Sequence, residues 1–187
     1  MVTIATTILS LTLSLANAHM LLKNPPSLGF TGNKLATKPD SDLNAPISKA
    51  QFRGAGKSVA TWPAGSNQAF SLAGGATHGG GSCQVSLSYD NGETFKVIKS
   101  FIGNCPSGSE RDYSFSLGNR EMYMGCAAVT ITNGGSGLGT SYPKVFVANI
   151  ENGCQTAAEG VLEFPNPGGV VERSSEPAFK PVGAGCV

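Results

Sequence analysis

From Gln68 onward, polar and apolar residues alternate in short runs, and no segment shows the sustained stripe of an amphipathic helix. The alternation is clearest at residues 84–89, which read Q-V-S-L-S-Y, as expected of a strand with one buried face. Asp90-Asn91-Gly92 follows, and Asn-Gly readily adopts the positive φ angles of a tight hairpin turn. Residues 94–98 are expected to return as the partner strand. The sequence therefore predicts an all-β fold.

Further strands are expected at residues 127–132 and 144–150, whereas residues 21–64 are predicted to form surface loops. The chain has 25 glycines and 11 prolines, and only 13% of its residues are charged, as is typical of a turn-rich β domain. Short strands separated by turn signals predict a β-sandwich. We expect one domain over residues 19–169, with a single core, followed by an extended tail over residues 170–187.

The chain opens with a short apolar run, residues 2–15, which leads into Ala16-Asn17-Ala18. An A-x-A triplet after such a run is the cleavage signal of a secretory signal peptide, predicted here over residues 1–18. Cleavage would make His19 the first residue of a secreted, extracellular protein. No other apolar stretch approaches the length of a membrane span, so no membrane partner is expected. The formal net charge of +1 argues against a nucleic-acid partner.

Five cysteines in an exported chain predict disulfides, and none of them has the C-x-x-C spacing of a structural zinc site. We expect Cys83 to pair with Cys105 across the hairpin, and Cys154 to pair with Cys186 near the end of the chain. Because five is an odd number, Cys126 is left without an intrachain partner.

The chain contains two histidines, and their positions are the main indication of chemistry. As a first residue, His19 could close a chelate on one metal ion with its α-amine and its ring Nδ1. His78 lies in A-T-H-G-G-G-S-C-Q, where three glycines leave its ring free to face solvent or a metal. Two imidazoles and one amine form a three-nitrogen set that suits copper. Taken alone, His78 is more simply a loop histidine without function.

Other chemistries fit the sequence less well. His-Gly-Gly-Gly also occurs in esterases, but the chain has no G-x-S-x-G nucleophile motif. A thiol nucleophile at Cys83 conflicts with its expected disulfide. The glycine-rich residues 134–139 lack a P-loop lysine. Nothing in the sequence positions Glu121 and Glu163 as the carboxylate pair of a glycosidase.

Several motifs occur together and in one order along the mature chain: His-Met at its start, A-x-H-G-G-G-S-C-Q, G-N-R-E-M-Y-M-x-C-A, F-V-A-N-I, N-G-C and E-F-P-N-P-G. Jointly they resemble the fungal chitin-active lytic polysaccharide monooxygenases of auxiliary activity family 11. The resemblance implies an immunoglobulin- or fibronectin-like β-sandwich that holds one copper ion. It also implies oxidative cleavage of glycosidic bonds in crystalline chitin by a monomer, with an external reductant and hydrogen peroxide or O2.

The resemblance also implies a role for particular residues. The amine and Nδ1 of His19 and a ring nitrogen of His78 would bind copper, with Tyr123 at an axial position. Ala76 would flank the opposite axial side. Glu121 would lie close enough to hydrogen-bond an oxygen species on the copper.

The chain departs from the family pattern in two places. Family members carry a cysteine in an F-P-C-K stretch, where this chain has Phe52-Arg53-Gly54, and this difference would explain the unpaired Cys126. They also have a tryptophan-rich strand before G-N-R-E-M-Y, whereas here Leu117 runs directly into Gly118. The alternative prediction is therefore a copper-binding or chitin-binding protein that has lost catalysis with this strand.

Overall fold

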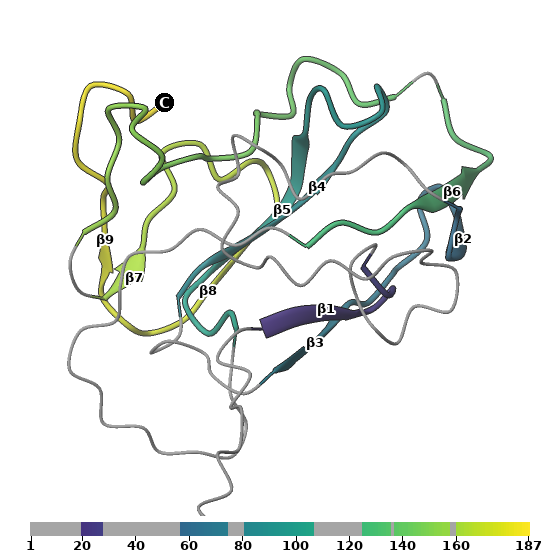
Figure 1. Ribbon diagram of the computed structural model, residues 1–187, viewed down its shortest axis with the longest axis horizontal. Helices are drawn as coiled ribbons and strands as arrows, with labels where there is room; N and C mark the ends of the chain where they lie inside the picture. Colours follow the sequence, from purple (N-terminus) through teal and green to yellow (C-terminus); the bar gives the residue numbers. More distant parts are fainter. Residues whose placement is uncertain (1–19, 28–56, 75–80, 107–124, 136, 158–159) are drawn as a thin grey trace, which may run out of the picture.

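The computed structural model describes residues 20–27, 57–74, 81–106, 125–135, 137–157 and 160–187 (Figure 1). Within these ranges every regular element is a strand, which confirms the all-β class. No described segment forms a helix long and apolar enough to cross a membrane. The strands are β1 Met20–Asn24, β2 Ala60–Pro63, β3 Ser71–Gly74, β4 Cys83–Leu87, β5 Lys96–Ile102, β6 Val129–Thr132, β7 Val161–Leu162, β8 Val171–Arg173 and β9 Ala178–Phe179.

The strands form four small sheets in the described part of the chain. β1 pairs with β3 and β4 pairs with β5, both antiparallel, whereas β6 lies parallel to β2. β8 adds to the other edge of β5 in parallel, and β9 lies parallel to β7. These sheets do not by themselves display the two layers of an immunoglobulin-like sandwich.

The β4–β5 hairpin confirms the prediction made from its alternation and turn signal. Cys83 is opposite Phe101 and Leu87 is opposite Lys96, with one irregularity in the register between Val85 and Ser86. Asn91 and Gly92 both have positive φ, at 57° and 88°. The connection between the two strands nevertheless extends over residues 88–95, because the side chain of Asp90 organises a longer turn than Asn-Gly alone requires.

Asp90 accepts three hydrogen bonds within this connection. Its Oδ1 accepts from the Ser88 hydroxyl and from the Thr94 backbone N–H, both at 2.8 Å, and its Oδ2 accepts from the Thr94 hydroxyl. These bonds favour the ionised carboxylate, those from Thr94 most, and they lower the pKa of Asp90 from 3.8 to about 2.

Asp90→Asn is therefore expected to reduce stability near neutral pH, where the native carboxylate is fully ionised. Because the folded pKa lies below the unfolded value, the carboxylate stabilises the fold above pH 3.8, and this stabilisation is lost as the pH falls toward 2. The urea midpoints of the variant and the native protein should thus converge at about pH 2. Glu93→Gln removes the same charge from the same turn and is the control. A D90N difference that stayed constant from pH 7 to pH 2 would contradict this role.

Two expectations about strands were wrong. Residues 21–64 were expected to be surface loop, but β1 and β2 fall largely within this range because distant segments supply their partners, β3 and β6. Residues 144–150 were expected to be a strand, but only Lys144 makes a ladder bridge, to Lys96. The alternation there reflects burial: Phe146 and Ala148 are 3% and 0% exposed. The Phe146 N–H donates to the Gln84 side chain, and Asn149 has a positive φ of 62°, so no ladder continues.

The hydrophobic core lies beside β5 and the C-terminal half of the chain. The rings of Phe146 and Phe164 meet edge to face with centroids 5.8 Å apart. Residues 170–187, expected as an extended tail, carry β8 and β9, and partly buried Val171, Ala178 and Cys186 pack against this core. The core cluster consists of Ile102, Phe146, Ala148, Cys154, Val161 and Phe164.

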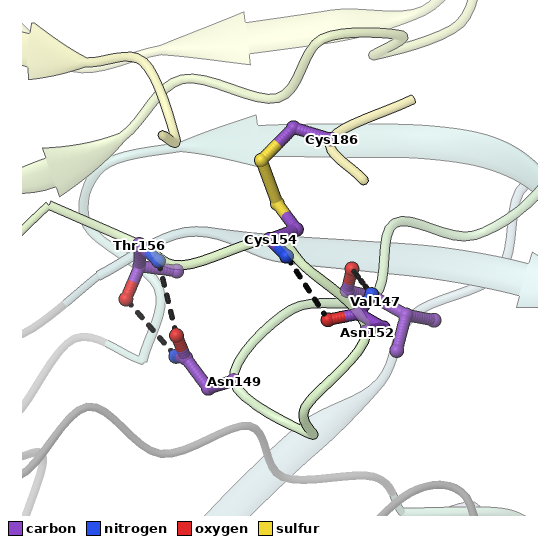
Figure 2. The surroundings of a disulfide bond; sticks show 6 residues. All are labelled: Val147, Asn149, Asn152, Cys154, Thr156 and Cys186. Carbon is purple, nitrogen blue, oxygen red and sulfur yellow. Dashed lines mark hydrogen bonds between the residues drawn. A yellow bond between two sulfur atoms is a disulfide. The ribbon is translucent and has the colours of Figure 1, made fainter. Parts of the chain in front are cut away.

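Both expected disulfides are present, and Cys126 is a free cysteine, as predicted. Figure 2 shows how asparagine side chains brace the loop beside Cys154. Asn149 and Thr156 exchange two hydrogen bonds of 3.0 Å, and the Asn152 amide donates to the Val147 carbonyl at 2.9 Å. The F-V-A-N-I and N-G-C motifs therefore build the loop to which the C-terminal segment is joined.

Candidate functional site

The four residues expected to form the site, His19, His78, Glu121 and Tyr123, lie outside the described residues, as does Ala76. Their coordination stays a prediction. Among the described segments that flank these residues in the sequence, the one before His78 and the one after Tyr123 both contact β1, the strand that follows His19.

The pairing of β1 with β3 joins the segments that carry the two histidines (Figure 1). Met20, the residue after His19, is opposite Gly74, which precedes His78 by four residues. A chain extends at most about 3.6 Å per residue, so His78 lies within roughly 15 Å of Gly74. The sheet therefore brings together the described residues that follow His19 and precede His78 in the sequence.

The segment that follows His78 is also held in place. The carbonyl of Gly81 accepts a 3.3 Å hydrogen bond from the N–H of Cys105, close to the Cys83–Cys105 disulfide. The Ser82 hydroxyl donates to the Leu162 carbonyl at 2.6 Å and accepts from the Gly103 N–H at 3.2 Å. The glycine-rich histidine segment is thus anchored at one end by a sheet and at the other by a disulfide.

The segment that follows Tyr123 approaches β1 closely. A Cβ added at Gly125 would lie only 3.0 Å from the Cβ of Leu22, so a larger residue would require one of the two segments to shift. Gly125 follows Tyr123 by two residues, and Leu22 follows His19 by three. Leu22 and Gly125 are the described residues that the sequence analysis missed. The local signal for this contact is the glycine itself, which lets two backbone segments approach closely.

Cys126 lies next to this contact and is half-buried. Burial raises the pKa of its thiol to about 11, so the thiol is protonated at neutral pH and is a poor nucleophile and metal ligand. We therefore assign it no part in the chemistry of the site.

The structure also bears on the rival chemistries. Cys83 is consumed in a disulfide and cannot act as a thiol nucleophile. Glu163 forms a bidentate ion pair with Arg173, in which the two guanidinium nitrogens lie 2.6 and 2.8 Å from the carboxylate oxygens. This partner lowers the pKa of the Glu163 carboxyl. The general acid of a glycosidase needs a raised pKa instead. Among the described residues, no group of three His, Cys, Asp or Glu side chains could hold a metal ion.

Known proteins from two Aspergillus species are similar to this chain, although no family model matches it. The chain is 39% identical to AA11 family lytic polysaccharide monooxygenase A of Aspergillus fumigatus, over 78% of this chain and 81% of that protein. It is 30% identical to an AA11 family lytic polysaccharide monooxygenase of Aspergillus oryzae, over 84% and 48% of the two chains. It is 36% identical to lytic polysaccharide monooxygenase B of Aspergillus fumigatus, over 59% and 38%.

The chain thus spans most of the first relative and less than half of the other two. The alignment with the first relative extends over 178 positions but takes in only 78% of the 187 residues here. That relative therefore has residues at positions where this chain has none. Identity at this level over most of both proteins shows that the chain belongs to the AA11 family of lytic polysaccharide monooxygenases.

Proposed function

We propose that the chain is a secreted, monomeric, copper-dependent monooxygenase that cleaves glycosidic bonds in crystalline chitin. Membership of the AA11 family supports a polysaccharide substrate and copper. The β1–β3 pairing is the structural observation that supports the proposal, because it joins the strand that follows His19 to the strand that precedes His78. The two disulfides agree with export from the cell.

The donor chemistry of the proposed site fits copper. Two imidazoles and a terminal amine are nitrogen ligands of the kind that suits copper. His19 would bind through its amine and Nδ1, His78 through a ring nitrogen, and Tyr123 through its phenol oxygen. The histidine and amine nitrogens must be deprotonated to bind, so the residues hold the metal best above their own pKa values.

Copper would supply one-electron redox chemistry toward hydrogen peroxide or O2, with electrons from an external reductant. The role of the protein would be to hold the copper ligands in place and to leave room for the oxidant. Glu121 would hydrogen-bond the oxidant and orient it toward the sugar. We place this site on a sandwich domain of residues 19–169, exposed by removal of the signal peptide at residues 1–18.

Mass spectrometry of the products released from β-chitin tests the proposed activity. Mature protein loaded with copper and supplied with ascorbate and hydrogen peroxide should release oxidised oligosaccharides. The same protein stripped with a chelator is the control and should release none. If the loaded protein bound copper but released only unmodified sugars, the proposed reaction would be wrong.

A non-catalytic copper-binding or chitin-binding protein is the second candidate. It is favoured by the residues that the first relative has and this chain lacks, because a lost strand would leave such a difference. This candidate predicts tight Cu(II) binding, or retention on chitin, without oxidised products under the conditions above.

Gly125→Ala probes the contact between β1 and the segment of Tyr123. The new Cβ would approach the Leu22 Cβ to 3.0 Å, so one segment must shift, and we expect copper affinity to fall severalfold. Gly135→Ala is the matched control, because its new Cβ would have no heavy atom within 4 Å. Titration calorimetry measures both affinities. Equal values for the two variants would show that this contact does not position the ligands.

A further inference from the structure

A small cavity lies at the turn end of the β4–β5 hairpin, where the segment after β6 passes beside it (Figure 1). Its volume is about 140 Å³. This is below the roughly 300–1,000 Å³ of a pocket for a drug-sized ligand, so it suits one ring of a longer molecule. The lining includes Tyr89, Asp90, Thr94 and Lys96 of the hairpin, together with Gly137 and Leu138 of the segment after β6.

Tyr89 is the aromatic wall of this cavity and is 51% exposed. Its ring lies against the backbone of Gly137, because a Cβ added there would meet ring atoms at 3.5 and 3.6 Å. Gly137 has a positive φ of 110°, which favours glycine at this position. The ring is therefore supported by Gly137, while about half of the residue is open to solvent. A ring that is already held in place loses little freedom when a ligand stacks on it.

The polar groups of the cavity suit a neutral ligand rich in hydroxyl groups. The Asp90 carboxylate lines the cavity and accepts from Ser88, from Thr94 and from its own backbone N–H. The Lys96 ammonium also lines the cavity and donates to the carbonyls of Leu138 and Gly139, at 3.2 and 2.8 Å, and these bonds use two of its three protons. An anionic and a cationic group thus line the cavity together, which disfavours a phosphate or a cation.

We propose that this cavity is a second carbohydrate-binding site, in which one pyranose ring of a polysaccharide stacks on Tyr89 and hydrogen-bonds Asp90 and Lys96. The apolar C–H face of a sugar ring matches the exposed ring, and its hydroxyls match the donor and the acceptor. The proposal rests on the proposed function, because it takes the polysaccharide of that reaction as the ligand.

The cavity lies away from the strands that adjoin the two histidine segments in the sequence. In Figure 1 the hairpin turn lies on the opposite side of the molecule from β1 and β3, the strands beside the histidine segments. A sugar chain held at Tyr89 would keep the protein at its substrate without occupying the oxidised position. The site should therefore bind sugar with no copper present.

Amide NMR of the copper-free mature chain, titrated with the hexamer of N-acetylglucosamine, tests the proposal. We expect the signals of residues 88–94 and 137–139 to shift, and Tyr89→Ala to weaken that binding about tenfold or more. Tyr142→Ala is the matched control: Tyr142 is 40% exposed and does not line the cavity, so its loss should leave the affinity unchanged. Thermal melting of the copper-free variants checks that both are folded.

Absence of shifts at these residues, or equal affinities for the Y89A and native chains, would overturn the second site. The proposed reaction is judged separately by oxidised products from β-chitin. Oxidised products from β-chitin without NMR shifts in the β4–β5 hairpin would contradict only the second site. Sugar binding at the hairpin without oxidised products would support the second site and count against the proposed reaction.

Discussion

His78→Ala is expected to lower the Cu(II) affinity of the mature protein by at least about a hundredfold, more than is typical for loss of a group that only supports a metal ligand. The reason is that the proposed site has three nitrogen ligands, and this variant removes one of the two imidazoles. Titration with Cu(II) in competition with a chelator of known affinity measures the change.

The melting temperature of copper-free His78→Ala serves as its control. The segment around residue 78 is anchored by β3 and by Gly81, so the copper-free variant should melt where the native chain melts. Bound copper should then raise the melting temperature of the native chain far more than that of the variant, because a ligand stabilises only the state that binds it. Equal copper-induced shifts in the two proteins would mean that His78 is not a ligand.

Replacement of both Cys154 and Cys186 by alanine is expected to lower the free energy of unfolding by about 3–4 kcal/mol, from the loop-closure entropy of cysteines 32 residues apart. The disulfide joins the C-terminal segment to the core, where Cys154 is 1% exposed. Its loss should also loosen the bridge between Gln155 and Val182, whose two hydrogen bonds measure 2.8 and 2.7 Å. Urea unfolding at neutral pH measures the effect.

Cys126→Ala is the matched control for this double variant, because it removes a sulfur that makes no disulfide. Its side chain is only half-buried, so we expect a cost well below that of the double variant. If the double variant lost no more stability than C126A, the C-terminal segment would be held by its strand pairing and packing alone.

The features that the sequence predicted correctly depend on residues close together in the chain. The β4–β5 hairpin follows from local alternation and from the positive φ of Asn91 and Gly92. Cys83 and Cys105 are brought together by the same hairpin, and Cys83 is opposite Phe101 in its register. Such short-range signals fix both the pairing and the disulfide.

The features that the sequence did not predict depend on distant partners. β1 is five residues long and pairs with β3, which lies about fifty residues later in the chain. β8 pairs in parallel with β5. Neither pairing leaves a turn signal in the sequence. Residues 144–150 show the converse case: their alternation is real, but it records which side chains are buried, and Asn149 ends any ladder. Alternation of polar and apolar residues shows which side chains are buried, but a strand forms only where a second segment is available to pair with it.

The site itself was predicted from motifs, and its coordination lies outside the described residues. The structure adds the framework around it: the opposition of Met20 and Gly74, and the close approach of Gly125 to Leu22. These contacts join to β1, which follows His19, the described segments before His78 and after Tyr123. They could not be read from the sequence because they join residues about fifty and one hundred positions apart.

Electron paramagnetic resonance of the Cu(II)-loaded mature protein tests the central claim, that one copper ion is bound by the N-terminal amine together with the rings of His19 and His78. The account predicts hyperfine coupling to three nitrogen nuclei in protein that begins at His19. Protein with one extra residue before His19 should lose this spectrum, because the chelate through the terminal amine is no longer possible. An unchanged spectrum in the extended protein would contradict the account.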